Sequence, residues 1–307
     1  LFYISLSVKE IYKITLVQYY LIQQSLLLIP LLCIFQFKHC FMKQIFFIAF
    51  LFAGIPSFCQ TTIQRDAEIE KMVKEISSDS LKSYIKSMVA FGTRNTLSTQ
   101  TNPKRGIGAA RNWVLGKFNE FAKQSDGRLS AFIDTTTLQP DKRRIDTVTL
   151  LGNVVATLKG TDPNDNRIFI ISGHLDNMRS SPTERMGDAP GANDDASGCA
   201  AVIECARIMS KHNFPATIIF VTVSGEEQGL LGSAFMSEKA KKENWNIVAV
   251  LNNDIMGSNN SNETNIINNT KVRVFSEGIP AYETEKVAAN IRNLGMENDG
   301  KSRQLAR

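Results

Sequence analysis

The sequence is short of histidine, of cysteine and of net charge. Among its 307 residues are three histidines and five cysteines. The formal net charge is +5, and residues 1–60 carry +3 of it through four lysines and one glutamate, so +2 remains for the other residues. That balance excludes the basic surface by which proteins bind nucleic acid. The apolar fraction of 43% is high enough to form a core, which excludes a chain disordered throughout.

We expect no disulfide framework. Cys199 and Cys205 lie six positions apart in a predicted helix, so they face roughly opposite directions. Both are interpreted as core residues, which is the common place for a free cysteine. The other three cysteines lie in an apolar N-terminal region.

The first 59 residues are interpreted as a targeting region. Residues 1–41 are apolar and begin without a methionine, so we interpret them as upstream sequence that is not native to the protein, or as an apolar leader. Residues 42–59 have the layout of a secretory signal peptide, with cleavage expected before Gln60. The mature protein is therefore predicted to be periplasmic or extracellular and not attached to a membrane. Acylation of Cys59, as in a lipoprotein, is the weaker alternative because the residue before it is bulky.

The pattern of apolar residues changes near residue 128. Before it, helical spacing predicts a helical lead-in at 60–127. After it, short runs rich in valine, isoleucine and phenylalanine alternate with helices, and two of these runs are apolar almost throughout. Such runs are typical of strands that are covered on both faces. We therefore expect an α/β fold, with a mixed, mostly parallel central sheet flanked by helices, in a domain at 128–307.

The predicted elements have the following bounds. The helices are expected at 64–77, 79–91, 107–123, 196–211, 230–242 and 281–294. The strands are expected at 129–133, 153–158, 167–172, 217–224, 247–252 and 272–276. Ser78 and Asp79 are predicted to cap the second helix.

Four polar clusters follow predicted strands. In chain order they are Gly173-His174-Leu175-Asp176, Gly191-Ala192-Asn193-Asp194-Asp195-Ala196-Ser197-Gly198, Gly225-Glu226-Glu227 and Asn252-Asn253-Asp254. Open α/β sheets bind ligands beyond the carboxyl ends of their strands. One imidazole and several carboxylates are donors that suit zinc, and Asp176 is placed to hydrogen-bond the ring of His174. The clusters therefore predict a metal site at one edge of the sheet.

Each cluster also has a purely structural interpretation. Taken alone, they would be a structural histidine, a helix cap, a solvated acidic pair and a polar turn. Two adjacent glutamates at a buried strand end repel each other, however, unless a cation or a proton compensates. One of Glu226 and Glu227 would then bind metal while the other moves protons. Likewise, one of Asp194 and Asp195 would bridge two cations while its neighbour stabilises the loop.

Together the four clusters resemble the secreted co-catalytic zinc aminopeptidases of bacteria. Relatives that share this fold include glutamate carboxypeptidase, glutaminyl cyclase and the transferrin receptor ectodomain. The resemblance covers residues 150–300 well and the helical lead-in weakly. It implies a metallopeptidase that binds two zinc ions and removes N-terminal residues from peptide substrates.

The resemblance also implies a role for each site residue. The implied zinc ligands are His174, Asp194, Glu227 and Asp254. Asp194 would bridge both ions, Glu227 would bind one of them, and the remaining two ligands would bind the other. Glu226 would be the general base, and Asp176 would orient the imidazole.

The chain departs from the family in one ligand. The second zinc of the family also takes a histidine near the end of the domain, and neither His39 nor His212 matches it. We expect that histidine beyond Arg307, so that the recorded chain is incomplete at its C-terminus and would be inactive without it.

Three other interpretations stay open. A glutaminyl-cyclase-like acyltransferase would need one zinc. A carboxypeptidase would need cations for the substrate carboxylate, and Arg179 and Arg185 lie near the site in sequence. A catalytically inactive, receptor-like binding module is the third. The sequence gives no signal for the oligomeric state.

Overall fold

A computed structural model describes residues 66–261, 265–270, 272, 274, 275, 284–294 and 305. All of them belong to the unit Arg65–Arg307. The predicted leader and the predicted signal peptide lie outside the described residues. Within the described residues, no helix is both long enough and apolar enough to cross a membrane.

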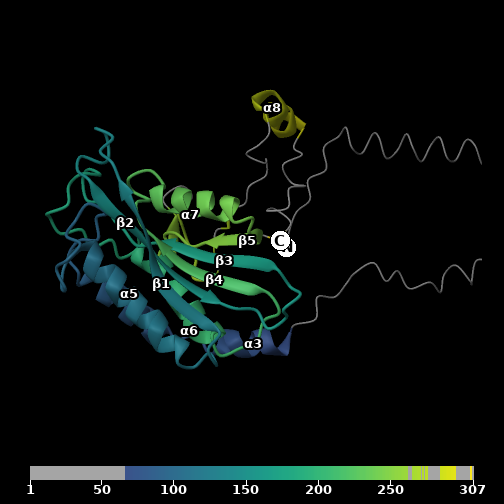
Figure 1. Ribbon diagram of the computed structural model, residues 1–307. Helices are drawn as coiled ribbons and strands as arrows, with labels where there is room; N and C mark the ends of the chain where they lie inside the picture. Colours follow the sequence, from purple (N-terminus) through teal and green to yellow (C-terminus); the bar gives the residue numbers. More distant parts are fainter. Residues whose placement is uncertain are drawn as a thin grey trace, which may run out of the picture. The chain divides into compact units, whose positions relative to one another are not determined.

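A five-stranded sheet forms the centre of the domain (Figure 1). Its strands are β1 (Leu129–Leu138), β2 (Thr149–Leu158), β3 (Arg167–His174), β4 (Thr217–Val223) and β5 (Asn246–Asn252), in the spatial order β1-β2-β4-β3-β5. The pairs β1/β2 and β2/β4 are antiparallel, whereas β3/β4 and β3/β5 are parallel. The sheet is mixed, as predicted, and its parallel part is confined to β4, β3 and β5. The carboxyl ends of these three strands therefore lie at one edge.

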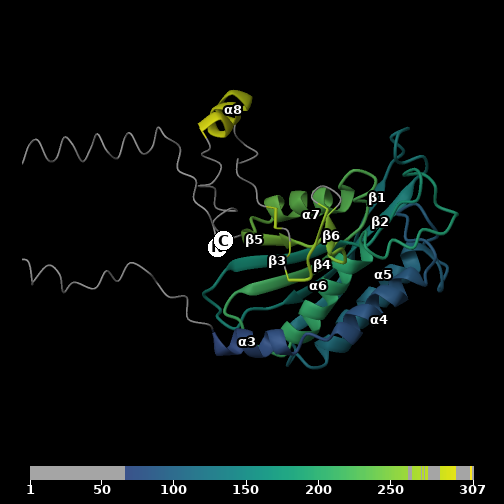
Figure 2. The ribbon, with the colours of Figure 1, turned by 180° about the vertical axis from the view of Figure 1, so that it is seen from behind.

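The two faces of the sheet are covered by different helices, because successive side chains of a strand point to opposite faces. Ile218 and Phe220 of β4 belong to the core that includes α6 (Ala196–Met209). Ile219 and Val221 belong to a second core with Met236 of α7 (Leu231–Lys242). Figures 1 and 2 show α6 and α7 on opposite sides of the sheet. This double cover explains why the β4 sequence is apolar almost throughout.

The helical lead-in contributes to the core on the α6 side. Its helices are α3 (Ala67–Lys74), α4 (Ser78–Val89) and α5 (Gly106–Ala122), which confirms the three predicted helices and the loop between the second and third. Met88 of α4 and Phe118 of α5 are 0% exposed and lie in the same core as α6. The predicted cap of α4 is wrong by one residue, since Ser77 accepts the backbone N–H of Ser80 at 3.1 Å.

The segment after β5 differs partly from the prediction. A short hairpin joins β6 (Asn260–Ser261) to β7 (Ile266–Ile267), and α8 (Glu285–Leu294) agrees with the last predicted helix. The predicted strand at 272–276 is wrong at its described residues, because Val272, Val274 and Phe275 are not in a strand. Phe275 is 82% exposed.

The core position of Phe220 leads to a stability prediction. Replacing Phe220 by alanine should lower the free energy of unfolding by about 3–5 kcal/mol, because it removes a fully buried ring and leaves a cavity. Phe132→Ala, in β1, is the matched control. The Phe132 ring is 44% exposed, and the Lys239 ammonium lies over it at 5.5 Å from the ring centroid. The control should cost about 1 kcal/mol or less. Urea unfolding of both variants measures the difference, and equal losses would contradict the assignment of the core.

Candidate metal centre

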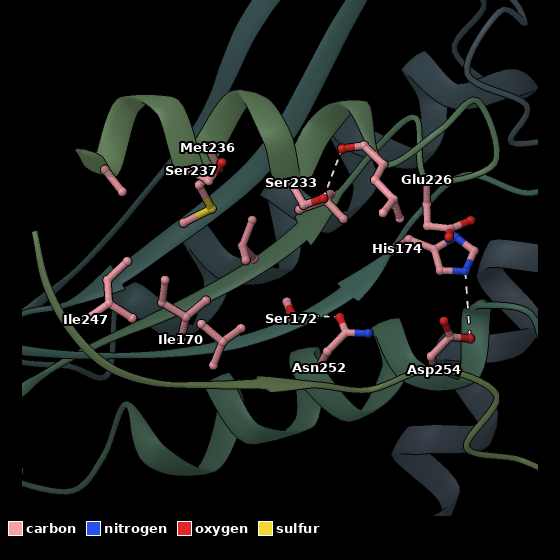
Figure 3. A pocket seen from close by; sticks show the side chains of 15 residues that line it. Ile170, Ser172, His174, Glu226, Ser233, Met236, Ser237, Ile247, Asn252 and Asp254 are labelled. Atoms are coloured by element: carbon pink, nitrogen blue, oxygen red, sulfur yellow. Dashed lines mark hydrogen bonds and ion pairs between the residues drawn. The ribbon is translucent and has the colours of Figure 1, made fainter. Parts of the chain in front are cut away.

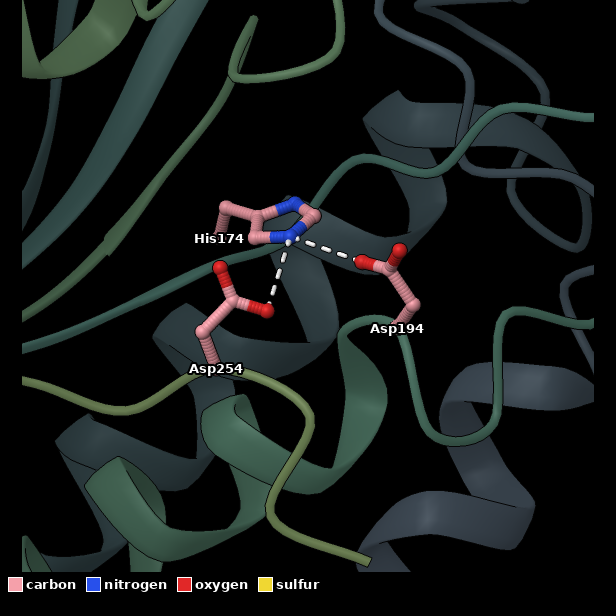
Figure 4. A group of neighbouring side chains, drawn as sticks. All are labelled: His174, Asp194 and Asp254. Carbon is pink, nitrogen blue, oxygen red and sulfur yellow. Dashed lines mark ion pairs between the residues drawn. The ribbon is translucent and has the colours of Figure 1, made fainter. Parts of the chain in front are cut away.

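Three of the predicted metal ligands meet at the carboxyl edge of the parallel strands. His174 Nε2 lies 2.9 Å from Asp194 Oδ1 and 3.9 Å from Asp254 Oδ1. The three donor atoms all lie within 4.8 Å of one another (Figure 4). The ring of His174 is buried, whereas both carboxylates are partly exposed. One divalent cation could therefore reach all three donors at the usual bond length of about 2 Å.

The strand register places two of these ligands. His174 is the last residue of β3 and pairs with Val223 at the end of β4. On the other side of β3, Ser172 pairs with Asn252 of β5. The Ser172 hydroxyl donates to the Asn252 amide oxygen at 2.8 Å. Asp254 comes two residues later. Parallel strands that end together thus bring an imidazole and a carboxylate from distant parts of the chain to the same point.

Asp195 stabilises the loop beside its neighbour Asp194, as predicted for one member of this pair. It is 0% exposed and caps α6, since its Oδ1 accepts the backbone N–H of Gly198 at 2.8 Å. Its Oδ2 accepts the backbone N–H of His174 at 3.0 Å. Burial raises the pKa of Asp195 to about 7, against the lowering effect of the His174 charge and of these hydrogen bonds. The Asp194–Asp195 peptide bond is cis.

The Asp176 carboxylate forms an ion pair with the His174 ring, while the shorter contact of the ring is to the backbone carbonyl of Asp176. The ring Nδ1 lies 3.1 Å from the backbone carbonyl oxygen of Asp176 and 3.7 Å from its carboxylate. The carboxylate also accepts the backbone N–H groups of Glu226 and Glu227, at 3.2 and 3.1 Å. The Oδ1 atom that accepts the Glu226 amide is also the atom 3.7 Å from the ring, so the carboxylate is shared between the turn after β4 and the imidazole. A neutral ring that donates from Nδ1 to the carbonyl would present the lone pair of Nε2 to a metal bound between it and Asp194.

The ionisation of His174 reflects the acids around it. Burial lowers its pKa, but the interactions with Asp176, Asp195 and Glu226 outweigh burial and raise the pKa to about 10. Without a metal, the imidazole is therefore held in its charged form at neutral pH.

Glu226 and Glu227 follow β4 and lie beside the three ligands. Burial, followed by repulsion from Asp194 and Asp176, raises the pKa of Glu227 to about 7. Burial also raises the pKa of Glu226, which is opposed by the charge of His174. Within the described part of the chain, the group of donors within 4.8 Å does not include Glu227. The role of Glu227 as a ligand thus stays a prediction. The raised pKa values of Glu226 and Glu227 show that burial and the neighbouring acids disfavour the ionised carboxylates, a cost that a proton or a cation offsets.

A pocket of about 420 Å³ opens beside these side chains (Figure 3). One end is formed by His174, Glu226 and Asp254. The other part of its wall is mainly apolar and comes from α7 and from β3, β4 and β5, with Ile170, Val221, Met236, Ile247 and Val250 among its residues. The pocket thus joins an apolar wall to the acidic end that carries the metal ligands.

The structure adds one residue to the site that the sequence did not predict, and it places one excluded histidine. Arg94 lies between the helices predicted at 79–91 and 107–123, yet it is 1% exposed and donates hydrogen bonds to both ligand-bearing loops. No sequence signal distinguishes this arginine from a surface residue. His212 lies just before β4 and pairs with Glu75 at 3.5 Å. It is therefore at the amino end of this strand, whereas the site is at the carboxyl ends, which agrees with its exclusion as a ligand.

Fold and site together define an α/β domain with a candidate metal centre, whose donors lie at the ends of parallel strands. Residues 153–295 match the family model described as Peptidase family M28, so the chain carries an M28 peptidase domain. This match confirms the resemblance at the level of the M28 peptidase family, and the observed mixed sheet flanked by helices confirms the predicted fold class.

Similar proteins come from fungi and from bacteria. A protein of Leptosphaeria maculans described as a probable zinc metalloprotease is 40% identical over 79% of this chain and 56% of its own length. A probable zinc metalloprotease of Pyricularia oryzae is 42% identical over 79% of this chain and 48% of its own length. The chain thus spans about half the length of these relatives. The solved structure of the LapA aminopeptidase of Legionella pneumophila, 24% identical, shares the fold with a TM-score of 0.50 over 64% of this chain and 48% of that chain.

The raised pKa values lead to a prediction about metal binding. Zinc takes deprotonated donors, so it must displace protons from His174, with a pKa of about 10, and from Glu227, with a pKa of about 7. The rise in Tm that zinc causes should therefore grow from about pH 5.5 to about pH 7.5, with affinity increasing up to about tenfold per pH unit for each proton displaced. Thermal unfolding with zinc and with a chelator measures this rise. His174→Ala, which should show no zinc-dependent shift, is the control, and a rise that shrinks with pH would contradict the prediction.

Proposed function

We propose that this domain is the catalytic part of a zinc-dependent aminopeptidase, which hydrolyses peptides at their N-terminal residue. The observation that carries the proposal is the meeting of His174, Asp194 and Asp254 beside the carboxylate of Glu226. An imidazole nitrogen and carboxylate oxygens within 4.8 Å are donors that zinc takes in catalytic sites. The description of the fungal relatives as probable zinc metalloproteases also supports zinc.

Two zinc ions account best for the number of acids. His174 and Asp254 would hold one ion, Glu227 would hold the other, and Asp194 would lie between them. Three carboxylates against two divalent cations leave a net positive charge, which favours the negative oxygen that develops during peptide hydrolysis. The repulsion that raises the pKa of Glu227 would be relieved by the same ions.

Glu226 is the proposed general base. Zinc bound beside it would polarise the scissile carbonyl and lower the pKa of water. The Glu226 carboxylate would take the proton of the attacking water and return it to the leaving amine. Its position at the end of the pocket is held by the hydrogen bond from its backbone N–H to Asp176. Because burial raises its pKa, it is a better proton acceptor than an exposed glutamate.

The base assignment is tested by Glu226→Gln in the full-length natural protein. This change keeps the shape of the side chain and should keep the bound zinc, but turnover should fall by about a hundredfold or more. Zinc content and hydrolysis of aminoacyl 4-nitroanilides measure the two effects. Glu238→Gln, on the exposed side of α7, is the matched control and should leave both unchanged. Near-normal turnover of Glu226→Gln would remove Glu226 from this role.

The same assays separate the rival functions. Cyclisation of peptides with an N-terminal glutamine, without hydrolysis of the nitroanilides, would favour the glutaminyl-cyclase-like alternative. A full-length protein that binds zinc and converts neither kind of substrate would favour the receptor-like module.

The pocket predicts which substrates are preferred. An apolar side chain placed against Met236 and Val250 would be removed from water, whereas an acidic one would face the negative charges of Glu226 and Asp254. Burying an apolar side chain stabilises binding by about 1.5–3 kcal/mol, so leucyl 4-nitroanilide should have a kcat/KM at least about tenfold above that of the glutamyl compound. Equal values for the two substrates would contradict this use of the pocket.

A further inference from the structure

Arg94 lies outside the segment that matches the M28 family, in the loop between α4 and α5. Although its sequence neighbourhood is polar, the side chain is 1% exposed. A buried guanidinium is costly unless its N–H groups have partners. The partners of Arg94 lie on both of the loops that carry metal ligands.

We propose that Arg94 is a positioning residue that sets the distance between the His174 and Asp194 segments, and thereby shapes the metal centre. This inference rests on the proposed metal site. It assigns a functional role to the helical lead-in, which the family match does not cover.

The first contact reaches the end of β3. Arg94 Nε donates to the backbone carbonyl of Leu175 at 2.8 Å. Leu175 lies between His174 and Asp176, so the arginine holds the backbone from which the imidazole projects.

The second set of contacts reaches the loop before α6. Arg94 Nη1 donates to the carbonyl of Pro190 at 3.0 Å, and Nη2 donates to that of Gly191 at 2.9 Å. Gly191 is three residues before Asp194. Nη1 also donates to the carbonyl of Met88 at 3.1 Å, at the end of α4. One planar group thus joins both ligand segments to the lead-in.

Asn177 extends the same network. Its Oδ1 accepts the backbone N–H of Arg94 at 2.9 Å, and its Nδ2 donates to the carbonyl of Ala189 at 2.5 Å. The two ligand segments are therefore linked through the arginine side chain and again through the asparagine.

The chemistry of arginine suits this task in two ways. Its donors form a rigid fork that can reach carbonyls in several directions, whereas the single ammonium of lysine cannot span them. All four of its side-chain hydrogen bonds described above end on backbone carbonyls. The guanidinium therefore adds positive charge near Asp176, Asp194 and Asp195 without occupying the carboxylate oxygens that a metal would use.

Arg94→Lys tests the proposal, with Co²⁺ as the probe. We expect the full chain carrying this change to bind Co²⁺ about 10- to 100-fold more weakly than the unmodified chain, as when other groups that orient metal ligands are altered. The visible absorption of the bound Co²⁺ should also change, because the ligands shift. Arg111→Lys is the matched control: Arg111 is also buried, and it donates to Gln100 Oε1 and to the carbonyl of Leu150 at 3.3 Å. The control should be less stable but bind Co²⁺ within about twofold of the unmodified chain.

A second variant covers the case in which Arg94→Lys does not fold. Asn177→Ala keeps the buried charge and removes one link of the same network, so it should also weaken Co²⁺ binding and change the spectrum. Unchanged affinity and spectrum in the folded variants would overturn the positioning role while leaving the proposed function intact. An unmodified chain that binds no Co²⁺ would overturn both.

Discussion

The candidate site depends on the buried carboxylate of Asp195. It accepts backbone N–H groups from His174, Gly198 and Ile255, at 3.0, 2.8 and 3.3 Å. These donors belong to the end of β3, the start of α6 and the segment after β5, which carry the three converging metal ligands. A Cβ at Gly198 would collide with the carbonyl of Asn253, so glycine lets α6 begin against that last segment. One fully hydrogen-bonded carboxylate thus fixes three backbone segments that are far apart in sequence, in an environment where an unpaired charge would be costly.

Asp176 extends this arrangement to the fourth segment. By accepting the backbone N–H groups of Glu226 and Glu227, its carboxylate fixes the turn after β4. The result is a dense group of acids, and burial together with mutual repulsion raises the pKa of Glu227 to about 7. The fold keeps these acids together against their repulsion. A proton or a divalent cation offsets this repulsion, so the hydrogen bonds that build the site also make it favourable for a cation to bind there.

The sequence could predict the ligands but not the groups that hold them. His174 and Asp254 were predictable because apolar runs mark the strands, and parallel strands end at a common edge. Whether the shorter contact of the His174 ring is to the carboxylate or to the carbonyl of Asp176 is not revealed by any local pattern, because the carboxylate is shared with the amides at the end of β4. The burial of Arg94 is decided by carbonyls more than 80 positions away in the sequence. Val272, Val274 and Phe275 are residue types that favour strands, yet they are not in one, because residue preference alone does not form a strand.

The segment that matches the M28 family begins at Asn153, inside β2, so the family match divides a strand of the central sheet. The residues before it complete the domain physically. β1 pairs with β2 over its full length, and α4 and α5 share the core with α6. The far end of α6 is tied to the lead-in as well, because Glu204 accepts the backbone N–H of Ser77 at 2.8 Å and Arg207 donates to the carbonyl of Glu75 at 2.7 Å. Since Asp195 caps the other end of this helix, the position of the metal ligands follows from how α6 packs on the lead-in. The lead-in is therefore part of the machinery that sets the geometry of the site.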